Sequence, residues 1–177
     1  MRKNFHLKRP SQSWWALLLA VLHERPMAQG VGIDCSAAAL AVAQGNAQGL
    51  GLEARATMRL ADWTQDGWAQ DLGRFDLILS NPPYVEQDAD LAPSVRGYEP
   101  AGALFAGADG LDDYRRLIPQ LPALLTPDGI AVLEIGHTQA EAVAALAAQA
   151  GFAARLHRDL AGRPRAVALS WKIEGRD

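Results

Sequence analysis

The 177 residues are long enough for one domain with a sizeable hydrophobic core, because 49% of them are apolar and 21% are charged. A net charge of −3 and a pI near 5.8 argue against a surface that neutralises a nucleic-acid backbone. One cysteine, Cys35, excludes an internal disulfide and a cysteine-rich metal site, and the four histidines lack ligand spacing. We therefore expect no metal, and a reducing, cytoplasmic compartment.

An apolar run of nine residues, 14–22, follows a basic N-terminal stretch, an order that superficially resembles a signal peptide. The run is too short to cross a membrane, and no small-residue cleavage pattern separates it from Pro26. We expect a buried helix that ends before Pro26, and no association with a membrane.

After Pro26, short apolar strands alternate with amphipathic helices, a pattern typical of a parallel α/β sheet. The expected elements are, in chain order, a strand over 30–34, a helix over 37–48 capped by Ser36, strands over 57–60 and 75–80, a helix over 114–125, a turn over 126–129, a strand over 130–135, an alanine-rich helix that begins with a capping box at 138–141, and a hairpin of 152–157 and 166–171. The sequence thus predicts a mostly parallel sheet with a C-terminal antiparallel hairpin.

The 28 residues from Tyr84 to Leu111 follow neither a strand period nor a helix period. A loop of this length in a compact domain is usually functional or disordered. Its aromatic and apolar residues favour an ordered lid over a binding site, and a mobile insertion is the alternative.

The tetrapeptide Asn81-Pro82-Pro83-Tyr84 directly follows the apolar strand over 75–80. Proline lacks an N–H and fixes φ, so the strand must end before the two prolines. The Asn81 side chain and the Pro82 carbonyl are then rigidly held acceptors for a planar group with N–H donors, and Tyr84 can stack on its face. A turn that merely ends a strand is the alternative. The four residues together favour a clamp for an amide or an exocyclic amine.

Two further strand ends carry polar or aromatic side chains. Asp34 ends the strand over 30–34, where open α/β sheets place an acid that binds ribose hydroxyls, although it could instead cap the next helix. Asp62 and Trp63 follow the strand over 57–60 and could face an adenine ring, although a tryptophan there could equally belong to the core. Parallel strands end at one edge of a sheet, so these residues and Asn81 predict a single cofactor pocket.

The tetrapeptide at 81–84 after a hydrophobic strand resembles the acceptor motif of amino methyltransferases that use S-adenosylmethionine and methylate adenine, guanine or glutamine amide nitrogens. Further segments favour one family: Tyr98-Glu99-Pro100 with Ala103-Leu104, Gly107-x-Asp109-Gly110-Leu111, Leu133-Glu134-Ile135-Gly136, and Asp159-Leu160-Ala161-Gly162-Arg163-x-Arg165. In this order, and over nearly the whole chain, they resemble the release-factor glutamine methyltransferases.

This resemblance implies a Rossmann-like class I methyltransferase fold. It also implies methyl transfer from S-adenosylmethionine to the side-chain amide of a glutamine in the Gly-Gly-Gln loop of peptide-chain release factors. By position, the cofactor would contact Asp34, Asp62, Trp63 and Asn81, the glutamine would contact Asn81, Pro82, Pro83 and Tyr84, and the catalytic residues would be Asn81, Pro82 and Tyr84. A release factor is the expected partner, and nucleic acid is not expected as a direct substrate.

The N-terminal segment departs from this pattern. Residues 1–13 resemble neither the first strand of the fold nor the Gly-rich loop that follows it, and no glycine precedes Gly30. The family's helical N-terminal domain also has no counterpart. We expect a catalytic domain over 14–177 that lacks its first strand and loop, an N-terminally truncated or frame-shifted relative with weakened cofactor binding.

Two other functions remain open. An adenine or guanine N-methyltransferase acting on DNA or RNA shares the acceptor motif, but would need a base-flipping pocket and a basic face. A catalytically silent fold is favoured by the missing loop. A methyl-transfer assay that offers a release factor and duplex DNA in parallel distinguishes glutamine methylation from nucleic-acid methylation. A cofactor-binding measurement distinguishes both from a catalytically silent fold.

Overall fold

The computed structural model describes residues 3–7, 15–86 and 106–172. Its strands are β1 (Lys3–Leu7), β2 (Gln29–Asp34), β3 (Ala56–Leu60), β4 (Phe75–Ser80), β5 (Leu125–Glu134), β6 (Phe152–Arg158) and β7 (Pro164–Trp171), and its α-helices are α1 (Trp15–Glu24), α2 (Ala37–Gly49), α5 (Asp112–Leu117), α6 (Leu121–Leu124) and α7 (Ala140–Gln149). One sheet has the order β3-β2-β1-β4-β5-β7-β6.

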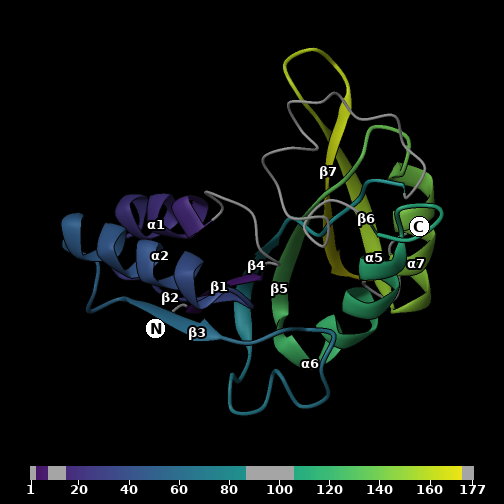
Figure 1. Cartoon of the computed structure of the whole chain (residues 1–177). Coiled ribbons are helices and arrows are strands. Elements are labelled where there is room, and N and C mark those ends of the chain that lie inside the picture. The colour runs from purple at the N-terminus through teal and green to yellow at the C-terminus, as the bar shows by residue number, and fades with distance from the viewer. Residues whose placement is uncertain (1–2, 8–14, 87–105, 173–177) are drawn as a thin grey trace.

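The sheet is parallel from β3 to β5, and β7 runs antiparallel to both β5 and β6. Helices α1 and α2 lie by β1–β3, while α5, α6 and α7 gather around β5–β7 (Figure 1). The predicted α/β class, with a mostly parallel sheet and a C-terminal antiparallel hairpin, is therefore confirmed.

The expectation that the first strand is missing is wrong. β1 lies in the middle of the sheet, where Phe5 is opposite Val31 of β2 on one side and Ile78 of β4 on the other. A strand buried in a parallel sheet normally reads as a continuous apolar run. The sequence KNFHL alternates polar and apolar residues instead, so its pattern did not indicate a central strand.

Segment 1–13, which matched nothing in the family pattern, thus contributes a strand to the same sheet as the rest of the chain. Residues 8–14, where the Gly-rich loop would fall, lie outside the described residues. So do residues 87–105, which hold most of the predicted lid and the Tyr98-Glu99-Pro100 segment.

The first two helices form as the sequence predicts. α1 buries Leu18, Leu19 and Leu22 and ends before Pro26, as expected of a buried helix. Within the described ranges, no helix has both the length and the apolar character needed to cross a membrane. α2 starts at its predicted cap, because the Ser36 hydroxyl accepts the Ala39 N–H at 3.2 Å.

The helix expected over 114–125 is broken into three pieces. α5 ends at Leu117, a 3₁₀ turn covers Ile118–Gln120, and α6 covers Leu121–Leu124. Pro119 and Pro122 remove backbone donors and clash with a continuous α-helix, which explains the interruptions. The predicted turn over 126–129 bulges out of β5, since Leu125 and Ile130 lie opposite Phe75 and Leu77 of β4.

The predicted capping box at 138–141 is also wrong. α7 has Gln139 rather than Thr138 at its N-cap, and no side chain there hydrogen-bonds the first turn of the helix. The Gln139 side chain bonds to other segments instead.

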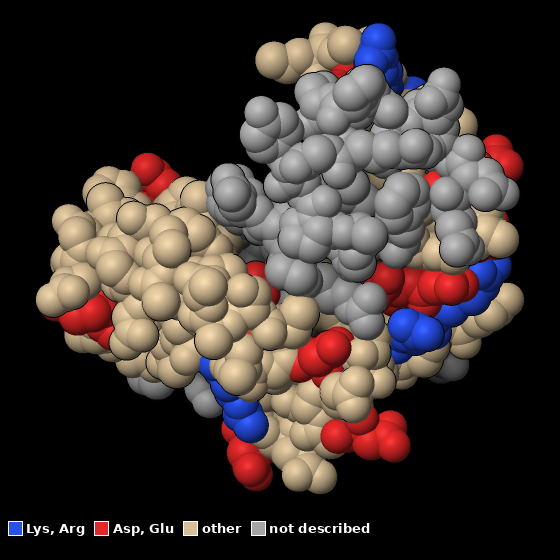
Figure 2. All heavy atoms as spheres, in the orientation of Figure 1, with Lys and Arg blue, Asp and Glu red and all other residues tan. Residues whose placement is uncertain are grey.

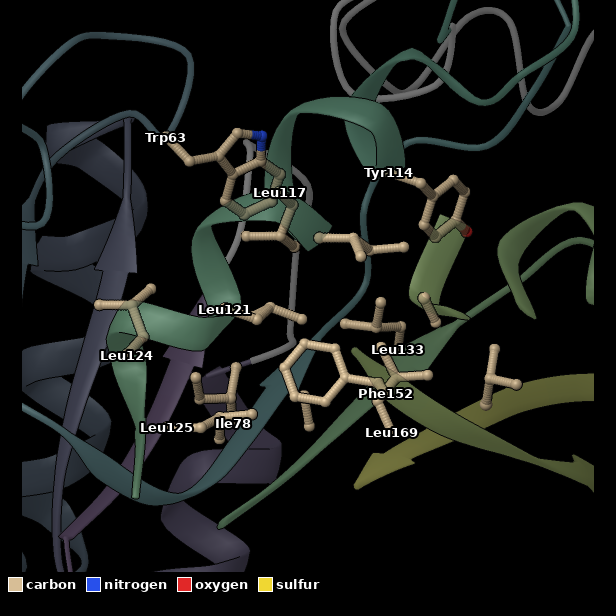
Figure 3. Packing of buried hydrophobic residues seen from close by; sticks show 14 of the residues in the cluster. Trp63, Ile78, Tyr114, Leu117, Leu121, Leu124, Leu125, Leu133, Phe152 and Leu169 are labelled. Carbon is tan, nitrogen blue, oxygen red and sulfur yellow. The ribbon is translucent and has the colours of Figure 1, made fainter. Parts of the chain in front are cut away.

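The larger of two hydrophobic clusters joins β4, β5 and the C-terminal strands to helices α5–α7 (Figure 3). Phe75 and Ile78 of β4 are fully buried in it, as are Leu121 and Leu133. The smaller cluster packs α1 and α2 against β3 and against Ala28, which precedes β2. Because β4 is anchored in the larger cluster, the start of the acceptor motif that follows it is held in place.

Candidate functional site

The structure brings the predicted strand ends to one edge of the sheet. Ile33 of β2 and Ser80 of β4 lie opposite the same residue of β1, Leu7. The next residues, Asp34 at the end of β2 and Asn81 just after β4, therefore stand two strand spacings apart, about 10 Å. A cofactor could bridge that distance across the end of β1.

Asp34 is buried, with 1% of its surface exposed. Its Oδ1 accepts the Ser36 N–H at 2.8 Å, and its backbone carbonyl accepts the Ala61 N–H at 3.1 Å. The first bond closes a turn onto Ser36, the residue that caps α2, so Asp34 is not itself the cap of this helix. The second bond holds the segment after β3 against the end of β2. Asp34 and Asp62 thus belong to adjoining segments.

Asp62 and Trp63 have separate roles in the structure. Asp62 Oδ1 accepts the Thr64 N–H at 2.9 Å and the Thr64 hydroxyl at 2.7 Å, which stabilises the turn after β3. The Trp63 side chain is 2% exposed in the larger hydrophobic cluster, and its Nε1–H donates to Asp113 Oδ1 at 2.9 Å. Its ring belongs to the core, as the core alternative predicts, in the same cluster as Leu117 (Figure 3).

The acceptor motif holds a buried oxygen without a hydrogen bond. Among the described residues, Asn81 Oδ1 has no donor within reach although the atom is buried. Pro82 and Pro83 are themselves buried and fix the backbone on which it stands. A buried acceptor left unpaired costs about 1–3 kcal/mol, so this oxygen is suited to bind an incoming N–H.

Tyr84, which follows β4, lies near two charged residues, Glu134 at the end of β5 and Arg165 of β7. Arg165 Nη1 is 3.5 Å from the Tyr84 hydroxyl and 3.6 Å from Glu134 Oε1. Burial, and next the negative charge of Glu134, raise the pKa of the Tyr84 phenol above its ordinary value of 10.0. Tyr84 is therefore a neutral phenol at physiological pH and can serve as a flat, uncharged wall.

We expect the Tyr84 phenol to ionise above pH 10.0. Because the folded pKa is raised, the stabilisation from the neutral phenol is complete below the unfolded pKa and is lost as the pH rises through the folded one. An ultraviolet titration of the protein minus that of Tyr84→Phe measures this pKa. A difference curve with its midpoint at or below 10.0 would show that Tyr84 is neither buried nor close to Glu134.

Sequence reasoning missed Gln139, Arg165 and Glu134 as parts of this region. Arg165 and Glu134 stand in segments that carried the family resemblance, but their spacing in the chain gave no sign that they meet Tyr84. Gln139 was assigned to a capping box. In the described ranges, no three His, Cys, Asp or Glu side chains gather as metal ligands. The absence of a metal from the whole chain stays a prediction.

An open hollow of about 1180 Å³ lies at the opposite edge of the sheet, near the amino ends of the strands. Ala20 and Met27 line it together with Leu77 and Ile130. It contains none of the predicted site residues, and ligands of open α/β sheets bind at the carboxyl ends of the strands. We therefore place the candidate site at the carboxyl edge, around Asp34 and Asn81.

A family model described as a methyltransferase domain matches residues 16–159. The chain belongs to the methyltransferases. Among its relatives, release factor glutamine methyltransferase of Rhodospirillum rubrum is 46% identical over 163 residues, which are 90% of this chain and 49% of that protein. The corresponding protein of Cereibacter sphaeroides is 49% identical over 85% of this chain and 54% of its own length. The chain spans about half the length of the curated relatives it matches.

Solved methyltransferase structures share the fold. A ribosomal protein L11 methylase from Lactobacillus delbrueckii subsp. bulgaricus superimposes with a TM-score of 0.61 at 20% identity, over 98% of this chain and 72% of that chain. The hMettl16 catalytic domain gives a TM-score of 0.67 at 12% identity, over 98% and 66%. At these identities the likeness shows the fold alone. The predicted resemblance to release-factor glutamine methyltransferases is confirmed by the sequence relatives.

Proposed function

We propose that this methyltransferase transfers a methyl group from S-adenosylmethionine to the side-chain amide nitrogen of a glutamine in peptide-chain release factors. The observation that carries the proposal is the buried Asn81 oxygen, which has no hydrogen bond among the described residues and stands at the carboxyl end of β4. The named function of the relatives that match most of the chain supports it.

The residues at the carboxyl edge suit this cofactor. Asp34 supplies a carboxylate at the end of β2, suited to ribose hydroxyls. Asp62 and Trp63 follow β3 beside it, and we propose that this segment borders the adenine, although the buried Trp63 ring offers no open stacking face.

The acceptor amide would be held by hydrogen bonds from its two N–H groups to Asn81 Oδ1 and the Pro82 carbonyl, with Tyr84 against its face. S-adenosylmethionine, when bound, supplies an activated methyl group, so a C–N bond forms as a C–S bond breaks. The clamp presents the nitrogen in line, and its oxygens stabilise the positive charge that develops there. The proton can leave to water after transfer, so no strong base is required.

The proposal favours a protein substrate over nucleic acid. On the face in Figure 2, basic and acidic side chains are interspersed among uncharged ones rather than gathered by sign. Arg115, one of the described cations, is paired with Asp109 at 2.6 Å, and the net charge of the chain is −3. A phosphate backbone would find little attraction on such a surface.

Cofactor binding gives the first test. In Asp34→Asn the Oδ1 that accepts the Ser36 N–H is retained, but the charge is removed. We expect the affinity for S-adenosylmethionine to fall by about 10- to 100-fold, because a hydrogen bond to a charged group contributes about 1.5–3 kcal/mol. Isothermal titration calorimetry measures the change.

Asp128→Asn is the matched control, since Asp128 is exposed in the bulge of β5. Equal affinity for Asp34→Asn and the unaltered protein would remove Asp34 from the site. No binding by the unaltered protein at millimolar cofactor would contradict the proposed cofactor.

A further inference from the structure

Gln139 joins three segments at the carboxyl edge of the sheet. Its Oε1 accepts the Gly136 N–H at 3.0 Å, and its Nε2 donates to the Tyr84 carbonyl at 3.0 Å and to the Gly110 carbonyl at 3.2 Å. The residue is 6% exposed. One buried amide therefore connects the chain after β4, the chain before α5 and the turn after β5.

The surrounding backbone is fitted closely to this amide. A Cβ on Gly110, whose φ is +70°, would collide with the Tyr84 carbonyl oxygen and lie 2.5 Å from Gln139 Nε2. A Cβ on Gly136 would lie 2.9 Å from Gln139 Oε1 and 3.4 Å from the Tyr84 ring. Only glycine fits at Gly110 without strain. Gln139, Tyr84, Gly110 and Gly136 therefore form one closely packed unit.

The position of Gln139 in α7 shows that its side chain serves other segments. It is the N-cap residue of the helix, where a side chain normally accepts an N–H from the first turn. The Gln139 amide makes no such bond and satisfies three backbone groups elsewhere. A fully paired buried amide of this kind fixes a single arrangement of the segments it joins.

We propose that Gln139 is a positioning residue for methyl transfer, because it fixes the acceptor clamp through the Tyr84 carbonyl. The inference rests on the proposed function. Pro82 and Pro83 stiffen the backbone between Tyr84 and Asn81, so a displacement at Tyr84 is passed on to the Asn81 carboxamide. At the far end of the Tyr84 side chain, Arg165 Nη1 lies 3.5 Å from the hydroxyl and helps to hold the ring in place.

Two substitutions test the role of the Gln139 amide. Gln139→Met keeps the length of the side chain and removes every polar atom. Gln139→Glu keeps an acceptor for the Gly136 N–H but replaces the donor that bonds Tyr84 and Gly110. Gln44→Glu makes the same chemical change on the exposed side of α2 and is the matched control.

Hydrogen–deuterium exchange of the free proteins reads the geometry without any need for activity. We expect faster exchange over residues 81–86 in both Gln139 variants, unchanged exchange over β2 and β3, and no change in Gln44→Glu. Unchanged exchange over 81–86 in both Gln139 variants would overturn the positioning role.

Steady-state kinetics with a release factor reads the consequence. We expect kcat to fall by about 10- to 100-fold in both Gln139 variants, since a displacement of about 1 Å can cost that much, while the Kd of S-adenosylmethionine stays unchanged. If the affinity for S-adenosylmethionine and the Tm both fall together with kcat, Gln139 has a purely structural role and the inference is overturned. If the unaltered protein transfers no methyl group, the proposed function fails, and hydrogen exchange alone decides the role of Gln139.

Discussion

Asn81→Ala is expected to lower kcat for methyl transfer by about 100- to 1000-fold while the Kd of S-adenosylmethionine changes little. The substitution removes the buried Oδ1 that has no hydrogen-bond partner among the described residues, and with it one of the two acceptors proposed for the substrate amide. Loss of one preorganised group that stabilises developing charge typically costs this much. Steady-state kinetics and cofactor titration on the same preparation separate the two effects.

Asn46→Ala is the control for this substitution, because Asn46 is an exposed residue of α2. If kcat of Asn81→Ala stays within about threefold of the unaltered protein, the loss is far smaller than expected for a charge-stabilising group, and Asn81 is excluded from the clamp. A collapse of cofactor affinity instead would place Asn81 in the cofactor pocket alone.

His6→Pro is expected to lower the free energy of unfolding by about 3 kcal/mol or more, out of a total of about 5–15 kcal/mol for a domain. The backbone at His6 lies between Gly32 of β2 and Leu79 of β4. A strand between two neighbours uses its N–H groups in the ladder, and proline both removes one and obstructs the pairing. Urea denaturation followed by circular dichroism measures the loss.

His6→Ala separates the backbone from the side chain, since alanine retains the N–H. We expect its free energy of unfolding to stay much closer to that of the unaltered protein. If His6→Pro is as stable as His6→Ala, β1 is not an inner strand of the sheet in solution.

The sequence predicted the strands and helices whose local signals agree with their environment. β4 reads as an apolar run that ends at two prolines, and α2 begins at a serine, so both were located correctly. β1 could not be found in this way, because KNFHL lacks the continuous apolar run of a strand buried in a parallel sheet. Its place is fixed by the unpaired edges that β2 and β4 would otherwise leave in the middle of the sheet.

The candidate site was predictable only in part. The placement of Asp34 and Asn81 at one edge of the sheet was predicted because parallel strands end together, a rule that needs no knowledge of side-chain contacts. The hydrogen bond from Trp63 to Asp113 spans 50 residues, and the bond from Gln139 to Tyr84 spans 55. Contacts at such separations leave no periodic pattern in the sequence, which is why the sequence left the burial of Trp63 open and gave no sign of the contacts that Gln139 makes.

The finding of β1 bears directly on function. A sheet without its central strand would have left Asp34 and Asn81 on separate pieces of structure. Because Leu7 of β1 pairs with the residues that precede them, the backbone pairing of β1 sets the positions of Asp34 and Asn81 relative to each other. A missing central strand is therefore no longer a reason to expect weak cofactor binding.

The most direct test is methyl transfer to a release factor that carries a Gly-Gly-Gln loop, with radiolabelled S-adenosylmethionine. The same release factor with that glutamine replaced by asparagine, and duplex DNA, are the parallel acceptors. We expect label on the glutamine-containing release factor alone, and labelling about 100- to 1000-fold slower with Asn81→Ala. Label on the DNA or on the asparagine variant, or no label on any acceptor although the cofactor binds, would contradict glutamine methylation by this chain.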